Sequence, residues 1–205
     1  MRFIIPTFLA TAATVLAAPI AVRDPPGIPS ASTANTLLAG LTVRASSNED
    51  SYDRNLFPHW SAISGNCNAR EFVLERDGTN VVVNNACVAQ SGTWRSPYDG
   101  ETTGNASDLD IDHMVPLKNA WISGASSWST TRRQEFANDV SGPQLWAVTA
   151  GVNRSKGDRS PDSWVPPLAS FHCTYAKSWV QVKSSWSLSV TSAEKAALSD
   201  LLGTC

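Results

Sequence analysis

The sequence predicts an α+β fold built as one domain. Residues 109–113 alternate polar and apolar side chains, the period of two that is typical of a strand. Residues 174–186 instead repeat their large apolar side chains at helical spacing, which predicts a long amphipathic helix. From residue 47 onward the composition is even, and a length of roughly 160 residues suits a single hydrophobic core.

The N-terminus is expected to carry a secretion signal over residues 1–17. Arg2 gives it a positive start, an apolar stretch follows, and small residues end it at Ala17. The stretch is shorter than the roughly 20 apolar residues that a membrane span needs, and no second run of that length follows. We therefore expect a secreted protein without a membrane partner.

Residues 18–46 are rich in Pro, Ser, Ala and Thr. This composition predicts a flexible N-terminal segment or propeptide, with one short ordered element over 37–43.

Within the domain, apolar spacing, β-branched runs and turn residues place the remaining elements. We expect a helix at 68–76, a strand at 81–83, a turn at 92–100, the strand at 109–113, helices at 116–123 and 129–138, a strand at 144–149, a turn leading into a helix at 152–158, and helices at 174–186 and 192–202. Ser129 and Thr130 are natural N-caps for the helix at 129–138. Thr191 or Ser192 could cap the last helix, with Glu194 in its first turn.

The cysteines are Cys67, Cys87, Cys173 and Cys205. An even count in a secreted chain implies disulfides, and four cysteines permit about three pairings. The local pairing, Cys67–Cys87 with Cys173–Cys205, closes two modest loops and ties down the last residue of the chain. The chain has no CxxC pair, which argues against a cysteine-type zinc site.

The formal net charge of −2 excludes a broad basic surface of the kind that many nucleic-acid-binding proteins carry. Positive charge is instead local. It clusters at Arg132 and Arg133, and again at Arg154, Lys156 and Arg159.

The segment DLDIDHMVP joins three alternating aspartates to a histidine. On a strand, residues i and i+2 share a face, so the aspartates would line one side and attract a divalent cation. The neighbouring histidine has an ordinary pKa near 6.5, which suits water activation close to neutral pH. The alternative is a surface loop with a solvated histidine. The residues are Asp108, Asp110, Asp112 and His113.

This segment, together with NRSKGD from Asn153 to Asp158, resembles the first and last motifs of the HNH endonucleases, whose fold is a ββα-metal finger. The wider likeness is to a family of secreted HNH-type proteins of fungi and actinobacteria. It is carried by RSPYDG, DIDHMVPLKNAWISGASSW, RRQEFAND, NRSKGDRSPDSWVPP and CTYAKSWVQVK. The resemblance implies that residues 47–205 form an HNH-type nuclease domain, with the finger embedded in a mostly helical domain that two disulfides stabilise.

The resemblance also implies roles for individual residues. His113 would be the general base, and Asp112 and Asn153 would hold one divalent cation. Carboxylate and amide oxygens suit Mg²⁺, with Mn²⁺ as the alternative. Asp110 would support this site without binding the ion, and Asp108 would be solvated.

Asn138, in FAND, is the nearest candidate for the central asparagine of the motif, which positions the histidine loop. A helix C-cap or turn residue is the alternative reading of Asn138. Arg133, Arg154 and Lys156 are the expected phosphate contacts. His59 and His172 lack a neighbouring carboxylate and are expected to be structural.

The function implied is that of a secreted, metal-dependent and monomeric endonuclease that hydrolyses DNA, or RNA, with little sequence specificity. One alternative is a non-catalytic secreted interaction protein on the same scaffold. Another is a calcium-stabilised binding protein, which leaves His113 without a role.

Two glycosylation sequons occur, at Asn105 and Asn153. We expect a glycan on Asn105 alone, because folding would bury the amide of Asn153 against the metal.

Overall fold

The computed structural model describes residues 23–205 and combines helices with antiparallel strands. This mixture confirms the expected α+β class; the expected secretion signal lies outside the described residues. The helices are α1 (Ala31–Gly40), α2 (Ala69–Asp77), α3 (Leu117–Ile122), α4 (Thr130–Ala137), α5 (Ala150–Lys156), α6 (His172–Ser185) and α7 (Ser192–Leu202). The strands are β1 (Ala62–Ser64), β2 (Cys67–Asn68), β3 (Thr79–Val83), β4 (Ala89–Arg95), β5 (Thr102–Thr103), β6 (Leu109–His113) and β7 (Leu145–Thr149).

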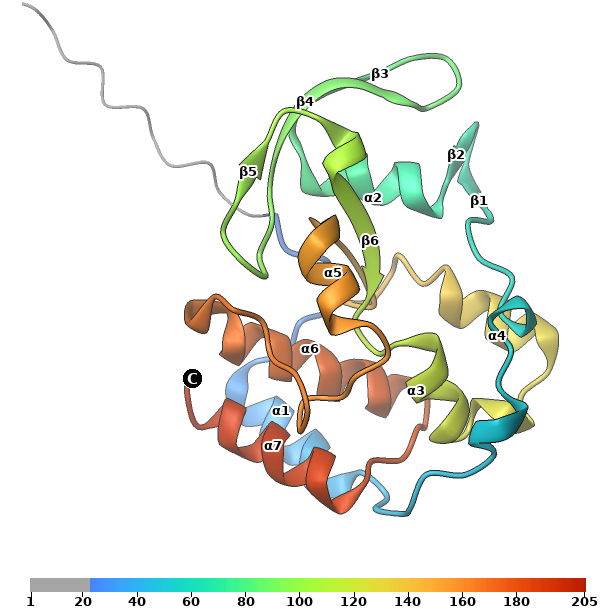
Figure 1. Ribbon diagram of the computed structural model, residues 1–205, viewed down its shortest axis with the longest axis vertical. Helices are drawn as coiled ribbons and strands as arrows, with labels where there is room; N and C mark the ends of the chain where they lie inside the picture. The colour runs from blue at the N-terminus through green and yellow to red at the C-terminus, as the bar shows by residue number, and fades with distance from the viewer. Residues whose placement is uncertain (1–22) are drawn as a thin grey trace, which may run out of the picture.

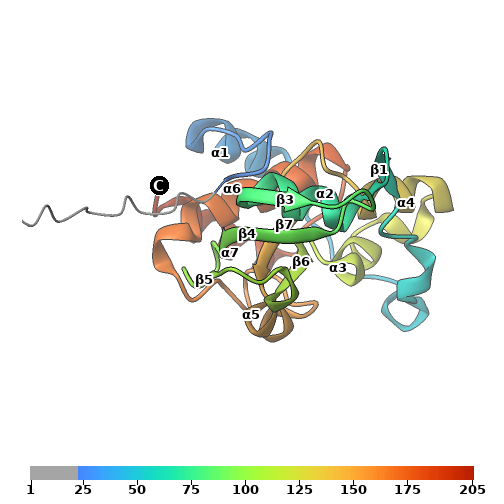
Figure 2. The same ribbon diagram turned by 90° about the horizontal axis from the view of Figure 1, so that it is seen from above.

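Two groups of buried side chains organise these elements. The larger group joins α1, α6 and α7 at one end of the molecule, and the smaller joins α2 to the strands at the other (Figure 1). Figure 2 shows the same elements from above, along the line that joins these two ends. Strand β7 lies between them, because Trp146 and Val148 face the larger group while Leu145 and Ala147 face the smaller. Because the side chains of a strand point alternately to its two faces, β7 contributes residues to both cores.

Strands β6 and β7 form a two-stranded antiparallel sheet, and α5 follows β7 directly. The register pairs Asp110 with Val148 and Asp112 with Trp146. Helix α5 packs on both strands, in the middle of the molecule in Figure 1. Helices α3 and α4 lie between β6 and β7 in the sequence, and the fold brings β6, β7 and α5 together at the segment that carries the aspartates and the histidine.

The N-terminal segment differs from the flexible stretch expected over 18–46 in the part that is described. Helix α1 packs against α6 and α7, and Ser30 caps it by accepting a hydrogen bond from the backbone N–H of Thr33. Its apolar residues join the larger core because they lie on one helical face, a pattern that the Ser- and Thr-rich composition hides. The buried residues are Ala34, Leu38 and Leu41.

Two expected boundaries also differ. The turn expected at 92–100 is confined to its second half, because β4 continues through Gly92 to Arg95. A Cβ at Gly92 would lie 2.7 Å from the Trp94 ring, so this glycine makes room for the indole instead of breaking the strand. The helix expected to follow a turn at 152–158 begins earlier, at Ala150.

The local disulfide pairing is confirmed, with bonds between Cys67 and Cys87 and between Cys173 and Cys205. The second bond joins the start of α6 to the end of the chain. Helices α6 and α7 are also linked by a buried ion pair, in which Lys183 Nζ lies 3.1 Å from Glu194 Oε1.

Candidate active site

Strand β6 presents different chemistry on its two faces. Asp110 and Asp112 share one face with α5, as the period of two predicts. Leu109 and Ile111 face the smaller core, and His113 ends the strand. The same strand therefore positions the carboxylates and the imidazole, which lie on opposite faces of it.

Asp112 lies at the centre of a buried network. Its Oδ2 accepts a hydrogen bond of 2.5 Å from the Tyr98 hydroxyl and one of 2.6 Å from the Lys156 ammonium. Lys156 Nζ also donates to the backbone carbonyls of His113, at 2.7 Å, and Met114, at 3.0 Å. Lys156 has no exposed side-chain surface, so the last turn of α5 is tied to the end of β6 by its charge.

Burial acts on both members of this ion pair. Desolvation raises the pKa of Asp112 and lowers that of Lys156, while their mutual attraction opposes both shifts. Three acceptors surround Lys156 Nζ, and three donated hydrogen bonds require the charged ammonium rather than the neutral amine. The geometry therefore assigns an ion pair, with Tyr98 as an additional donor to the carboxylate.

Asn153 lies beside Asp110, not beside the ion pair. Asn153 Nδ2 donates to Asp110 Oδ2 at 3.2 Å, and Arg154 Nε is 3.8 Å from the same oxygen. Asn153 and Lys156 lie three residues apart on α5, and Asp110 and Asp112 lie two residues apart on β6. The packing of the helix on the strand therefore aligns Asn153 with Asp110 and Lys156 with Asp112.

The unused oxygens of these residues fit a hard divalent cation. Among the described residues, no hydrogen bond reaches the second carboxylate oxygen of Asp110 or of Asp112, or the amide oxygen of Asn153. Carboxylate and amide oxygens are the donors that Mg²⁺ and Mn²⁺ prefer. Asp110, expected only to support the site, thus offers an oxygen beside Asn153.

His113 has one ring nitrogen fixed and the other without a partner among the described residues. Its Nε2 lies 2.9 Å from the carbonyl oxygen of Ala137. Because a carbonyl only accepts, Nε2 carries the hydrogen and Nδ1 keeps its lone pair. Burial lowers the pKa of His113 to about 3, against the ordinary value expected from the sequence. The imidazole is therefore neutral across the physiological range, and Nδ1 keeps its lone pair although burial weakens its basicity.

Asn138 hydrogen-bonds to a segment that lies next to His113. It ends α4, directly after Ala137, as the C-cap. Its side-chain amide donates to the carbonyl of Pro58 at 2.9 Å and accepts from the N–H of Ser61 at 2.7 Å. It is thus both the helix C-cap of the alternative reading and a residue that positions a loop next to the histidine.

The three expected phosphate contacts lie in different environments. Arg154 is exposed, with 76% of its side-chain surface accessible, and lies next to Asp110. Lys156 is committed to its buried ion pair. Arg133 is buried, and its guanidinium donates to the carbonyls of Leu56 and Trp128. Arg154 is thus the one of the three whose charge is exposed to solvent, where it can meet a substrate.

The sequence argument did not single out Tyr98, Trp60 or Arg54. Tyr98 lies in the quoted segment RSPYDG, but nothing local marked its hydroxyl as a partner of Asp112. The ring of Trp60 lies 5.9 Å from that of His113, and the charge of Arg54 is close enough to lower the pKa of His113. These residues reach the site from segments far from it in sequence.

Asp108, Asn105 and His172 make their contacts apart from this network. His59 is closer to the site, because its charge contributes to lowering the pKa of His113. Asp108 bonds to the hydroxyl of Thr103 at 2.6 Å, and Asn105 is exposed at the cap of a short turn. His172 Nε2 bonds to the carbonyl of Pro166, and His59 Nδ1 to that of Phe57. Glycosylation of Asn105 stays a prediction.

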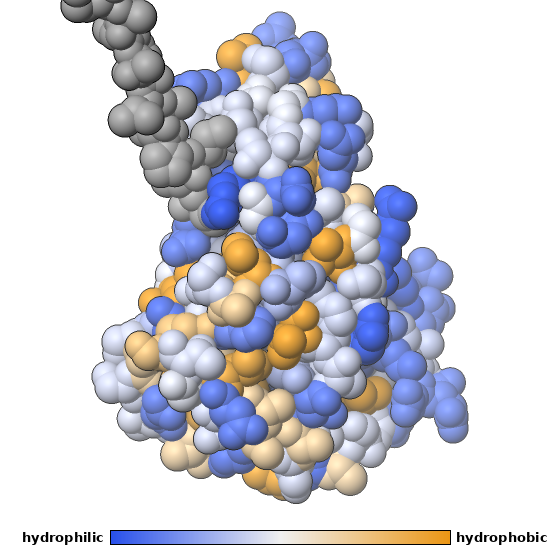
Figure 3. All heavy atoms as spheres, turned by 60° about the vertical axis from the view of Figure 1, so that its left-hand side comes forward, coloured by the Kyte–Doolittle hydropathy of each residue, from blue (hydrophilic) through white to orange (hydrophobic). Residues whose placement is uncertain are grey.

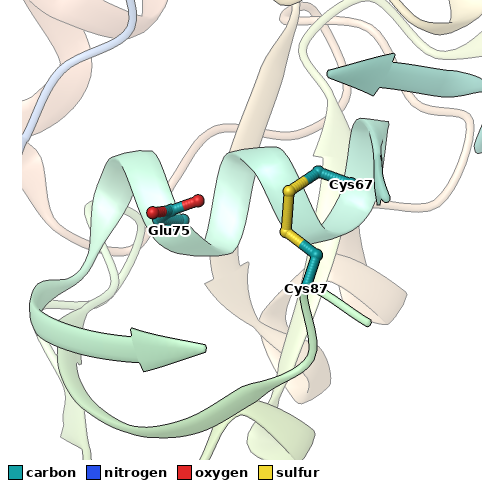
Figure 4. A group of neighbouring side chains, drawn as sticks. All are labelled: Cys67, Glu75 and Cys87. Atoms are coloured by element: carbon teal, nitrogen blue, oxygen red, sulfur yellow. A yellow bond between two sulfur atoms is a disulfide. The ribbon is translucent and has the colours of Figure 1, made fainter. Parts of the chain in front are cut away.

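Cys67, Glu75 and Cys87 also lie close together, as Figure 4 shows. The two sulfur atoms form a disulfide, so no thiolate is available and the cluster is not a metal site.

A surface hollow of about 560 Å³ between α4 and α6 is lined by Arg132, Trp186 and neighbours, and includes none of the residues around His113.

Residues 70–201 match the family described as "GmrSD restriction endonucleases, C-terminal domain". An "Uncharacterized secreted protein" of Arthroderma benhamiae (strain ATCC MYA-4681 / CBS 112371) is 62% identical over 201 residues, which cover 97% of this chain and 98% of the relative. No solved structure matches the chain. This relative and the two disulfides identify the chain as a secreted protein. In residues 23–205, no helix combines the length and apolar character that crossing a bilayer requires.

Proposed function

Because the chain belongs to the family of GmrSD restriction endonuclease C-terminal domains, we propose that it is a secreted endonuclease of the HNH type. It hydrolyses phosphodiester bonds of DNA, or RNA, with little sequence specificity. The observation that carries the proposal is His113, which is held neutral by burial, has no partner for Nδ1 within residues 23–205, and ends the strand that carries Asp110 and Asp112. The antiparallel pairing of β6 with β7 and the packing of α5 on both strands support the ββα finger.

In the proposed reaction, Nδ1 of His113 takes a proton from water as the water oxygen bonds to phosphorus. The bond from phosphorus to the leaving sugar oxygen then breaks, the sugar oxygen takes up a proton from solvent water to become a hydroxyl, and His113 releases its proton to solvent. Ala137 holds the imidazole in the required tautomer, and the negative charge of a bound phosphate raises the basicity that burial lowers. Arg154 contacts the phosphate.

Asp110, Asp112 and Asn153 would hold one divalent cation, Mg²⁺ or Mn²⁺, through their unused oxygens. When bound, it supplies Lewis-acid stabilisation of the charge on phosphate and leaving oxygen. Lys156 and Tyr98 fix Asp112 from the other side, so the carboxylate is oriented before any ion arrives.

Plasmid cleavage by the purified protein tests the proposal. We expect nicking with Mg²⁺ or Mn²⁺, none in EDTA, and a loss of about 10²–10⁴-fold in His113→Ala, the usual contribution of a general base. His172→Ala is the matched control and should keep wild-type activity. Cleavage by His113→Ala at the wild-type rate would remove this base from the mechanism, and no cleavage by wild type under any condition would favour the non-catalytic scaffold.

Direct measurement of Mn²⁺ binding, by calorimetry, separates the ligands from the base. Asp112→Ala and Asn153→Ala should each weaken binding, and the double variant should lose little more than the worse single one, because ligands of one ion act together. Asp108→Ala is the control. Independent, additive losses would show that Asp112 and Asn153 do not share an ion.

A further inference from the structure

Trp60 has a backbone conformation that its side chain disfavours. Its φ is +61°, in the left-handed region that bulky side chains rarely adopt. Asn48 and Asn80 also have positive φ, but asparagine tolerates this region through local hydrogen bonds of its short side chain. A tryptophan in this conformation persists only where its surroundings hold it there.

The surroundings of Trp60 include hydrogen bonds on both sides of it. Pro58 and Ser61 both bond to the side chain of Asn138, through a carbonyl oxygen and an N–H respectively. The Ser61 hydroxyl bonds in addition to Gln134 at 2.9 Å. The segment leading into β1 is therefore fastened to the end of α4, beside which it runs in Figure 1.

The result is that the indole lies against the imidazole of His113. The two ring centroids are 5.9 Å apart and the ring planes are inclined by 33°. On another side, Nε2 of His113 bonds to Ala137, the residue before Asn138. Asn138 thus holds two contacts of the imidazole, one made by Trp60 and one by the carbonyl of Ala137.

Trp60 is also partly buried against the smaller core. The segment also precedes residues 70–201, the part of the chain that matches the family. A wall of the site is thus built from outside the matched region.

We propose that Trp60 is a positioning residue for His113. Its indole limits rotation of the imidazole, so that Nδ1 faces the attacking water while Nε2 stays bonded to Ala137. This inference rests on the proposed function for its effect on catalysis, but not for its effect on the histidine ring.

The test compares Trp60→Leu and Trp60→Phe with the matched control Trp128→Leu. Trp128 is another partly buried tryptophan, and it packs on Phe136 and Trp186 instead of a histidine. Nitrogen–proton correlation spectra of the histidine rings are recorded without metal or substrate. Because the chain has three histidines, their signals can be assigned by substitution.

We expect a single His113 tautomer with hydrogen on Nε2 in the wild type and in Trp128→Leu. Trp60→Leu should shift the His113 signals and mix the tautomers. It should also lower kcat by up to about 10²-fold, the effect of a misplaced catalytic group, with KM unchanged. Trp60→Phe keeps an aromatic ring and should restore most of kcat while still moving the His113 signals.

Wild-type His113 signals in Trp60→Leu would overturn the proposal. So would a tautomer change in Trp60→Leu that leaves kcat at the wild-type level. If Trp60→Leu does not fold, unchanged His113 signals in Trp60→Phe would overturn it instead. If the wild type cleaves no nucleic acid, the proposed function fails, and the spectra alone decide whether Trp60 fixes the ring.

Discussion

At the scale of single residues, Lys156 shows that a charged side chain can have all its contacts inside the fold. The sequence placed it in a basic cluster and suggested a phosphate contact. In the structure its ammonium bonds to Asp112, His113 and Met114, and its side chain has no accessible surface. Such a pair adds little net stability over an apolar one, but the loss of one partner leaves an uncompensated buried charge.

We therefore expect Lys156→Met to lower the free energy of unfolding by about 3–5 kcal/mol. Arg154→Met, two residues earlier on the same helix, removes an equal charge from an exposed side chain and should change stability by no more than about 0.5 kcal/mol. Urea denaturation in EDTA measures both. Equal losses in the two variants would show that the buried pair is not what holds α5 to β6.

The pKa of His113 predicts how stability depends on pH. In the unfolded chain the pKa is near 6.5, and burial lowers it to about 3 in the folded protein. The folded state therefore binds this proton less readily. Its contribution is fully present above pH 6.5 and is lost as pH falls from 6.5 towards 3.

His113→Gln removes this titration while keeping a donor for the carbonyl of Ala137. Between pH 6.5 and 4.5, the wild type should lose up to about 1.4 kcal/mol per pH unit more than the variant. Chemical denaturation of the metal-free proteins across this range measures the difference. Parallel curves for the two proteins would refute the lowered pKa.

At the scale of elements, α1 shows that composition alone misjudges a helix with a narrow apolar face. Leu38 is 5% exposed and packs in the larger core among residues of α6 and α7, whereas its neighbour Leu37 is only partly buried. We expect Leu38→Ala to cost about 2–5 kcal/mol, the usual loss for a buried leucine. Leu37→Ala should cost clearly less.

Thermal or urea unfolding of the two leucine variants checks this prediction. Similar small losses of unfolding free energy at both positions would contradict the packing of α1 and would favour the flexible N-terminal segment that the composition suggests. A large loss confined to Leu38 would show that α1 is part of the folded domain.

At the scale of the whole molecule, a net charge of −2 opposes the approach of a polyanion. Hydrophilic and hydrophobic residues are interspersed on the face in Figure 3. Nucleic-acid binding must then depend on few local cations, foremost Arg154. Each phosphate contact contributes about 0.9 to the slope of log affinity against log salt concentration.

Arg154→Gln should therefore weaken binding of a DNA duplex and reduce that slope by about 1. Binding is measured in the His113→Ala background, which avoids cleavage. Arg132→Gln is the matched control, because its guanidinium lies 4.8 Å from the centre of the Trp128 ring and lines a hollow that includes none of the proposed site residues. A salt slope unchanged by Arg154→Gln would remove this residue from the phosphate contacts.

The sequence by itself determined the features that depend on near neighbours. The alternation at residues 109–113 gave β6 with its bounds, and Thr191 with Glu194 forms the expected cap of α7. The local disulfide pairing also followed from short loops. In each case the signal lies within a few residues or one short loop, where strand period, capping and loop closure act directly.

Only the tertiary structure decided which side chains meet. Asn153 lies beside Asp110 and Lys156 beside Asp112 because α5 packs along β6 in one register, which the two cores set. Trp60 reaches His113 from a segment more than 50 residues earlier by the same route. No local pattern encodes such contacts, since their geometry depends on how whole elements pack.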